Sequence, residues 1–224
     1  MEGILVIDKP DGMTSHDVVA KVRRSLKVKK VGHAGTLDPM ATGVLVCLVG
    51  KATKLFDQFV AFDKVYRATM ILGLVTDSAD TQGEVISKKE FHAVTQQQLE
   101  DVLQEFRGEL EQVPPMYSAV KHKGKKLYEL ARQGIVVERE AKPIRIDELR
   151  IERFTPPEVD IYVACSKGTY IRQLAHDIGE RLGCGACISR IQRVAVGKYT
   201  LDEAVTLEEI HESHIRNWEN PTAV

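Results

Sequence analysis

Apolar residues recur at helical spacing in four parts of the chain, and each part predicts a helix with one buried face. Thr14 or Ser15 can cap the first of these helices, and Thr95 can cap the third. The fourth is expected to start at a Thr169 cap and to end near Leu182. The four helical segments predicted in this way are 15–26, 51–62, 95–106 and 169–182.

Short apolar runs and alternating runs between these segments predict strands. The segment 73–83 is turn-like, and its polar residues predict an exposed loop. After a last short strand, the sequence predicts an acidic helix. Because strands and helices mix without regular alternation, the pattern favours an α+β fold. The predicted strands are 4–7, 43–50, 65–72, 144–154, 159–165 and 197–201.

One loop near the amino terminus combines glycines with a single acid, in the segment 32–43, GHAGTLDPMATG. Its three glycines allow backbone conformations that other residues avoid. Pro39 disfavours helical geometry at Asp38, so this carboxylate is expected on an extended or turning backbone at the mouth of the buried strand 43–50. Taken alone, such an Asp is commonly a turn residue that caps its own loop.

The charge of the chain is segregated although its net value is only −1. Residues 21–30 hold six Lys or Arg and no acid, and residues 121–145 hold eight Lys or Arg against three Glu. Residues 202–224 carry the opposite charge, with six acids and one Arg. Basic segments of this kind can contact phosphates, whereas the acidic end is expected to avoid them.

Length and composition narrow the class of protein further. A chain of 224 residues can form one large domain or two small ones. It has no apolar run of membrane-spanning length and no signal-peptide pattern at its start, so we expect a cytoplasmic protein. The four Cys are expected to be thiols. Cys184 and Cys187 have the spacing of half a zinc site, but without a second such pair a turn after a helix is favoured.

Five stretches of the sequence, in order along nearly the whole chain, resemble the TruB-type tRNA pseudouridine synthases. The segment 32–43 resembles the family motif G-H-x-G-x-L-D-P-x-A-x-G, which supplies the catalytic aspartate. The stretch 4–15 resembles the opening strand and its K-P-x-G-x-T-S turn. The other three are KVYRA at 64–68, PPMYSAVK at 114–121 and SKGTYIR at 166–172.

The resemblance implies a fold, a reaction and a partner. The fold would be a long, mostly antiparallel mixed sheet flanked by helices, in one catalytic domain over 1–224, with 107–145 as an insertion that grips RNA. The usual carboxy-terminal RNA-binding domain would be absent. The reaction would convert uridine 55 in the T loop of tRNA to pseudouridine, with no metal and no organic cofactor. The partner would be the T arm of tRNA, bound by a monomer that needs no other protein.

The resemblance also implies roles for individual residues, although each of them alone fits a plain structural role. Asp38 would be the nucleophile or stabilise charge on the sugar, and Arg172 would pair with it through its two-pronged guanidinium. Tyr66 would stack on the uracil and help to remove the C5 proton, with Tyr170 as a second pocket tyrosine. Whether Asp38 attacks the base or the sugar, or whether an elimination intervenes, stays open.

Other residues would bind the flipped nucleotide or the RNA backbone. His33 would support flipping of the uridine out of its loop, and Lys9 would support the pocket. Ile191 stands where the family usually has a pocket leucine. The charged cluster expected to contact phosphates comprises Lys121, Lys123, Lys125, Lys126 and Arg132.

Two other functions are compatible with these residues. The first is an RNA-binding or tRNA-folding protein with little or no catalysis, against which the complete set of Asp38, Tyr66, Tyr170 and Arg172 argues. The second is a guide-RNA-dependent relative of the dyskerin type, which the short chain and the motif spacing disfavour.

Overall fold

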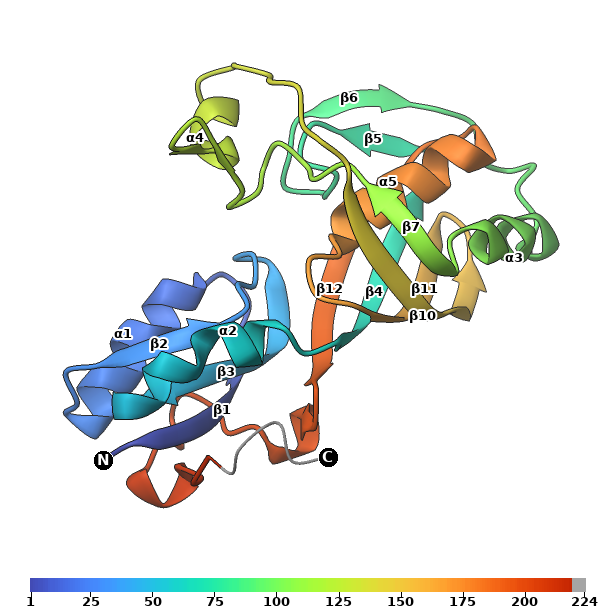
Figure 1. The fold of residues 1–224 in the computed structure, drawn as a ribbon. Coiled ribbons are helices and arrows are strands. Elements are labelled where there is room, and N and C mark those ends of the chain that lie inside the picture. The colour runs from blue at the N-terminus through green and yellow to red at the C-terminus, as the bar shows by residue number, and fades with distance from the viewer. Residues whose placement is uncertain (219–224) are drawn as a thin grey trace. The chain divides into compact units, whose positions relative to one another are not determined.

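The computed structural model describes residues 1–218, and the chain divides into two compact units (Figure 1). Unit 1 holds residues 1–67 and the segment from Ile191 onward, and unit 2 holds residues 68–190. Two strands contribute residues to both units, namely β4 (Lys64–Leu72) and β12 (Ala186–Val196).

Strand β3 (Ala41–Val49) is central to unit 1 and has partners along both edges. It pairs antiparallel with β1 (Gly3–Lys9) on one edge. On the other edge it pairs antiparallel with β2 (Val31–Ala34) and parallel with β12, with Ile191 opposite Ala41. Because β3 is covered on both edges and faces, it is apolar along almost its whole length.

The helices of unit 1 follow from their caps and apolar faces. Helix α1 (Ser15–Leu26) starts with a capping box in which Thr14 and Asp17 each satisfy the other's backbone N–H, and it buries the face that the sequence predicts. The predicted second helix is wrong in part, because it begins as the 3-10 helix η1 (Gly50–Leu55) and only α2 (Phe56–Val60) is α-helical.

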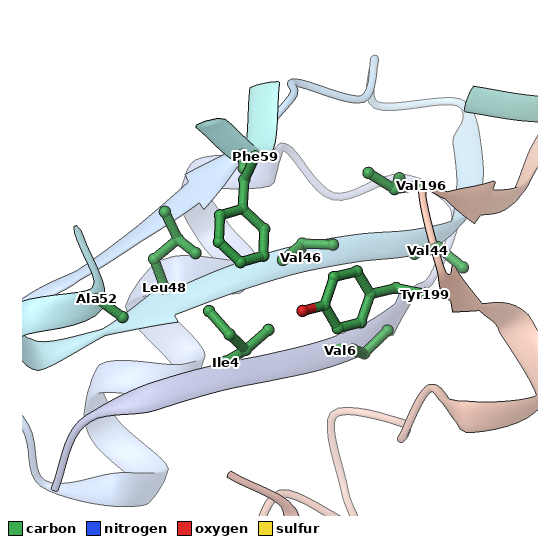
Figure 2. Close-up of a cluster of buried hydrophobic side chains, with 10 residues drawn as sticks. Ile4, Val6, Val44, Val46, Leu48, Ala52, Phe59, Val196 and Tyr199 are labelled. Atoms are coloured by element: carbon green, nitrogen blue, oxygen red, sulfur yellow. The ribbon is translucent and has the colours of Figure 1, made fainter. Parts of the chain in front are cut away.

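The core of unit 1 lies between its sheet and α2. Phe59 of α2 is fully buried and stacks on Tyr199, at 5.8 Å between ring centroids, above residues of β1 and β3 (Figure 2). Tyr199 belongs to β13 (Tyr199–Thr200), which pairs with β12. The labelled core residues are Ile4, Val6, Val44, Val46, Leu48, Ala52, Phe59, Val196 and Tyr199.

The predicted acidic helix after residue 201 is wrong within the described residues. Only the 3-10 helices η2 (Leu201–Glu203) and η3 (Glu212–His214) form there. The intervening chain instead pairs with the free edge of β1, where Val205 bonds to Val6 and Asp8, and Arg216 bonds to Ile4. Backbone pairing to a buried strand edge therefore overrides the helical pattern of the acids.

Unit 2 is a sheet in the order β12-β4-β11-β10-β7 with two helices packed on it. The long hairpin of β10 (Lys142–Thr155) and β11 (Glu158–Cys165) confirms two predicted strands. Strand β7 (Gly108–Gln112) extends the sheet by pairing antiparallel with β10. Helices α3 (Gln96–Glu105) and α5 (Ile171–Leu182) contact each other, and α3 also contacts β10.

The remaining elements of unit 2 are short. The hairpin of β5 (Leu74–Thr76) and β6 (Val85–Lys88) occupies part of the segment 73–88, so the prediction of a loop over 73–83 is wrong for β5. A second hairpin, β8 (Lys121–His122) and β9 (Lys125–Lys126), leads into α4 (Leu127–Ala131). Met116, Leu127 and Leu130 form a small apolar cluster beneath it.

The α+β class is confirmed, since helices flank a mixed sheet in which β3 and β12 run parallel, whereas β1 with β3, β10 with β11 and β7 with β10 run antiparallel. The predicted Thr169 cap of α5 is wrong. Tyr170 is the N-cap residue, and the Thr169 hydroxyl instead donates to the carbonyl of Ser166 at 3.0 Å.

Candidate functional site

Asp38 lies half-buried on the loop between β2 and β3, and side chains of unit 1 hold the backbone on either side of it. The hydroxyl of Ser15, at the start of α1, accepts from Leu37 N at 2.9 Å and donates to Leu37 O at 3.1 Å. Lys9, at the end of β1, donates to Pro39 O at 3.0 Å. The residues before and after Asp38 are therefore both fixed, and the carboxylate stands on a preorganised turn.

Arg193 ties the same loop to β3 from the opposite side. Its side chain is fully buried, and its Nε donates to Val44 O at 2.8 Å while its Nη2 donates to Gly35 O at 3.0 Å. The backbone of Arg193 pairs with Gly43, whose φ is +95°. A Cβ at Gly43 would lie 2.3 Å from Arg193 O, so only glycine allows this close approach of the two strands.

Two cations, Lys9 and Arg193, therefore lie buried beneath the loop. Burial lowers the pKa of the Lys9 ammonium to about 8, and the positive charge of Arg193 adds to this lowering. The carboxylates of Asp11 and Asp38 act in the opposite direction and favour the charged form of Lys9. The carboxylate of Asp38 is thus within electrostatic reach of the buried Lys9 ammonium.

His33 lies on β2, ahead of this loop, against the ring of His16. The two ring centroids are 5.3 Å apart and the rings meet edge to face. Burial, together with the charges of His16 and Arg193, lowers the pKa of His33 to about 4. Its buried Nδ1 has no hydrogen-bond partner among residues 1–218. His33 is therefore neutral near pH 7 and carries a ring nitrogen that is available for a new partner.

Two further candidates in unit 1, Tyr66 and Ile191, are buried on strands. Tyr66 is 9% exposed on β4, and Ile191 is 6% exposed on β12, where it pairs with Ala41. The carbonyl of Ile191 accepts a bond from the Thr42 hydroxyl at 3.4 Å. Ile191 is thus attached to the first residues of β3, directly after the Asp38 loop. The chemical roles of both side chains stay predictions.

Arg172 is 4% exposed in the first turn of α5, within unit 2. Its Nη1 donates to Ser78 O and its Nη2 to Tyr117 O, both at 2.7 Å. Its Nη1 also lies 3.7 Å from Asp80 Oδ2, which forms a buried ion pair. The guanidinium is therefore oriented by two carbonyls and one carboxylate. The pairing of Arg172 with Asp38 stays a prediction.

The segment that surrounds Arg172 contains residues that the sequence analysis placed in an exposed loop, which is wrong for two of them. Ser78 and Asp80 are both buried, and the Ser78 hydroxyl donates to Asp80 Oδ1 at 2.7 Å. Asp77 is exposed as expected and accepts a bond from the Tyr117 hydroxyl at 2.9 Å. Polar composition does not reveal this burial, because the Asp80 carboxylate finds its partners inside the protein: Ser78 and Gln82 N donate to Oδ1, and Arg172 pairs with Oδ2.

Tyr170 is half-buried immediately before α5 and is held by a side chain from β7. Gln112 accepts from Tyr170 N at 2.8 Å and donates to Tyr170 O at 3.1 Å. The sequence alone did not reveal the positioning roles of Gln112, Ser15 and Arg193. Ser15 ends the stretch 4–15 and Gln112 lies two residues before the stretch 114–121, so nearness to a family motif was the available signal for these two. Arg193 lies outside all five stretches.

The basic residues 121–126 form a tight hairpin. Its two turn residues, Lys123 and Gly124, have φ of +49° and +86°, which is the geometry of a two-residue hairpin turn. Lys126 Nζ, in the last residue of the hairpin, and Arg132 Cζ, beyond it, both lie 5.5 Å from the ring centroid of Tyr128. Of the five predicted phosphate contacts, all but half-buried Lys126 are exposed: Lys121, Lys123, Lys125 and Arg132. The hairpin thus presents a dense positive surface.

A carboxylate on a fixed turn and an exposed basic hairpin are features that suit an enzyme acting on an anionic polymer. Sequence comparisons identify the class as pseudouridine synthases. A model described as the N-terminal domain of the TruB family pseudouridylate synthases matches residues 23–171. A model of the tRNA pseudouridylate synthase B C-terminal domain matches residues 172–222. The chain belongs to the TruB family.

Similar curated proteins carry the name tRNA pseudouridine synthase B. The protein of Geobacter sulfurreducens is 49% identical over 212 residues, which are 95% of this chain and 70% of the relative. That of Opitutus terrae is 47% identical over 210 residues, or 94% of this chain and 87% of the relative. That of Heliobacterium mobile is 50% identical over 215 residues, or 95% of this chain and 70% of the relative.

Solved structures agree with this assignment. A Cbf5-Nop10-Gar1 complex contains a chain that is 32% identical, with a TM-score of 0.73 over 92% of this chain. An H/ACA RNP bound to a substrate RNA contains one that is 28% identical, with a TM-score of 0.69. This chain spans about half the length of those two chains. None of the helices in residues 1–218 has the length and apolar composition needed to cross a membrane.

Proposed function

We propose that this protein isomerises uridine 55 in the T loop of tRNA to pseudouridine, with Asp38 as the catalytic carboxylate. The observation that carries the proposal is the Asp38 loop, in which Ser15 and Lys9 fix the backbone on either side of the carboxylate. The names and identities of the TruB-family relatives support tRNA as the substrate.

The chemistry breaks the bond between the ribose C1′ and N1 of uracil, rotates the base, and joins C5 to C1′. The proton on C5 is then lost and N1 gains one, so the reaction is a balanced isomerisation. The Asp38 carboxylate supplies electrons to the electron-poor centre while the glycosidic bond is broken. In this proposal the Tyr66 hydroxyl helps to remove the C5 proton, and Arg172 orients Asp38. The isomerisation calls for no cofactor.

Access to the uridine requires that the base leave its loop. We assign His33 to this step, because its ring is neutral near pH 7 and can stack on the bases beside the position that the uridine leaves. Tyr170 and Ile191 would line the pocket. The exposed lysines of the hairpin would hold the phosphates of the T arm.

Guide-RNA-dependent modification is the competing proposal with an observation behind it, since two solved relatives come from assemblies with further proteins. The higher identity to proteins named tRNA pseudouridine synthase B favours direct action on tRNA. In this proposal the chain acts in the cytoplasm as a monomer, without a protein partner. Conversion of a T-arm transcript by the purified chain alone separates the two proposals. Conversion that appears only after guide RNA is added would favour the competing one.

The test of Asp38 uses a T-arm transcript with tritium on C5, because each conversion releases that atom to water. Asp38→Asn should lower the single-turnover rate by at least about 10³-fold, which is the scale of loss of a nucleophile, with RNA affinity nearly unchanged. Asp11→Asn is the matched control, since Asp11 is exposed and also interacts with Lys9. An active Asp38→Asn variant would remove Asp38 from the chemistry.

The test of the hairpin compares two double variants. Alanine at both Lys123 and Lys125 should weaken binding and lower the slope of log affinity against log salt by roughly 1.4–1.8 if each contacts one phosphate. Alanine at both Lys51 and Lys198, which are exposed in unit 1, is the control and should leave the slope unchanged. Equal slopes in the two double variants would rule out phosphate contact by the hairpin.

A further inference from the structure

Gln112 makes a two-point contact with the backbone of Tyr170, the residue that the proposed function places in the pocket wall. Its side chain is buried, with 5% exposed. The amide oxygen accepts from Tyr170 N at 2.8 Å, and the amide nitrogen donates to Tyr170 O at 3.1 Å. Because one planar amide meets both groups of the same residue, the contact fixes the orientation of Tyr170 as well as its distance.

The contact lies where α5 begins and where its own capping is weakest. Tyr170 is the N-cap residue of α5, and no side chain of the usual capping kind closes this end of the helix. The position of Tyr170 sets the first turn, in which Arg172 is buried against Ser78 and Tyr117. Gln112 therefore controls the start of α5 from outside the helix.

Gln112 also lies directly before the segment that carries the basic hairpin. It is the last residue of β7, and its backbone pairs with Lys142, the first residue of β10. The chain leaves the sheet after this pair and returns to it after the hairpin and α4. Within this segment, the carbonyl of Tyr117 accepts a bond from Arg172. The segment 113–141 is thus connected to Arg172 through Tyr117, and Gln112, the residue before it, is connected to Tyr170.

We propose that Gln112 is a positioning residue that holds Tyr170 in its reactive placement and links it to the segment 113–141, which lies within the predicted RNA-gripping insertion 107–145. The role of Tyr170 as a pocket residue rests on the proposed function, whereas the contact between Gln112 and Tyr170 is independent of it. Gln112 takes no part in bond making. Its amide acts only through the backbone of Tyr170 and so keeps the tyrosine in place while the segment 113–141 binds RNA.

The first experiment tests the contact without reference to activity. Gln112→Met keeps the length of the side chain and removes both hydrogen bonds, so the amide hydrogen of Tyr170 should exchange at least about tenfold faster. Gln104→Met, on an exposed site of α3, is the matched control. If Gln112→Met does not fold, Gln112→Leu serves, because it also removes both hydrogen bonds to Tyr170. Unchanged exchange at residues 170–172 in a folded Gln112 variant would overturn the proposal.

The second experiment tests the action through Tyr170. At saturating RNA, Gln112→Met should lower the single-turnover rate by about 10- to 100-fold, the effect of a misplacement of about 1 Å, and leave the Kd for RNA within about twofold. In a Tyr170→Ala background, Gln112→Met should lower the single-turnover rate by less than about twofold, since no tyrosine ring is left to misplace. Equal losses in the two backgrounds would overturn the proposal. If the parent chain converts no uridine, the proposed function fails and the exchange measurement alone decides on the contact.

Discussion

Replacing Gly43 by alanine should destabilise unit 1 much more than a glycine replacement that only introduces backbone strain. Gly43 has a φ of +95°, and a left-handed conformation costs a residue with a Cβ about 1–2 kcal/mol. Its Cβ would also lie 2.3 Å from Arg193 O and 3.0 Å from Arg193 N. The strands β3 and β12 must move apart to remove this overlap, which weakens one or two backbone hydrogen bonds worth about 0.5–1.5 kcal/mol each. We expect a loss of roughly 1.5–5 kcal/mol, of which about 0.5–3 kcal/mol comes from the close approach of the strands.

Gly12→Ala provides the matched control, because Gly12 has a φ of +79° and no atom lies within 4 Å of its added Cβ. It should cost only the strain, about 1–2 kcal/mol. Urea denaturation of the parent and of both variants gives the free energies of unfolding, provided that the slope m is unchanged. Equal losses for Gly43→Ala and Gly12→Ala would refute the argument that close strand approach, rather than φ alone, selects glycine at this position.

Three further predictions concern the site. Tyr66→Phe should keep RNA affinity and lose most of the single-turnover rate, and an unchanged rate would deny the hydroxyl a chemical role. Arg172→Lys should lower the rate strongly, because one ammonium cannot reproduce the planar fork that meets Ser78 and Tyr117; a parental rate would contradict this. The pKa of His33 is about 4 in the folded state and 6.5 in the unfolded state, so the unfolded chain binds more protons between these pH values. Stability should therefore fall as the pH falls from 6.5 to 4. The urea midpoints at pH 7 and pH 4.5 should differ less in His33→Gln than in the parent, and an equal difference would contradict the prediction.

Hydrophobic periodicity predicts the elements whose burial is one-sided and local. Helix α1 follows its capping residues and apolar face closely, as does α3. Strand β12 was missed because its alternation includes Arg193, a buried cation that looks like an exposed position in the sequence. The segment after residue 201 was misread because its fate depends on the free edge of β1, about 200 residues away in the chain. Period alone does not encode such distant partners.

The difference between local patterns and partners distant in the chain also explains which parts of the site the sequence reveals. A motif shows where Asp38 is, since proline and glycine fix the local backbone. It does not show that Ser15, Lys9 and Arg193 hold that loop, because each acts through backbone groups, and any residue supplies a carbonyl or an N–H. A catalytic side chain leaves a chemical signature in the sequence. A side chain that positions it leaves only a polar residue at a buried place, and burial is a property of the fold. The structure is therefore needed to find the residues that hold the site together, even where the motif already indicates the reaction.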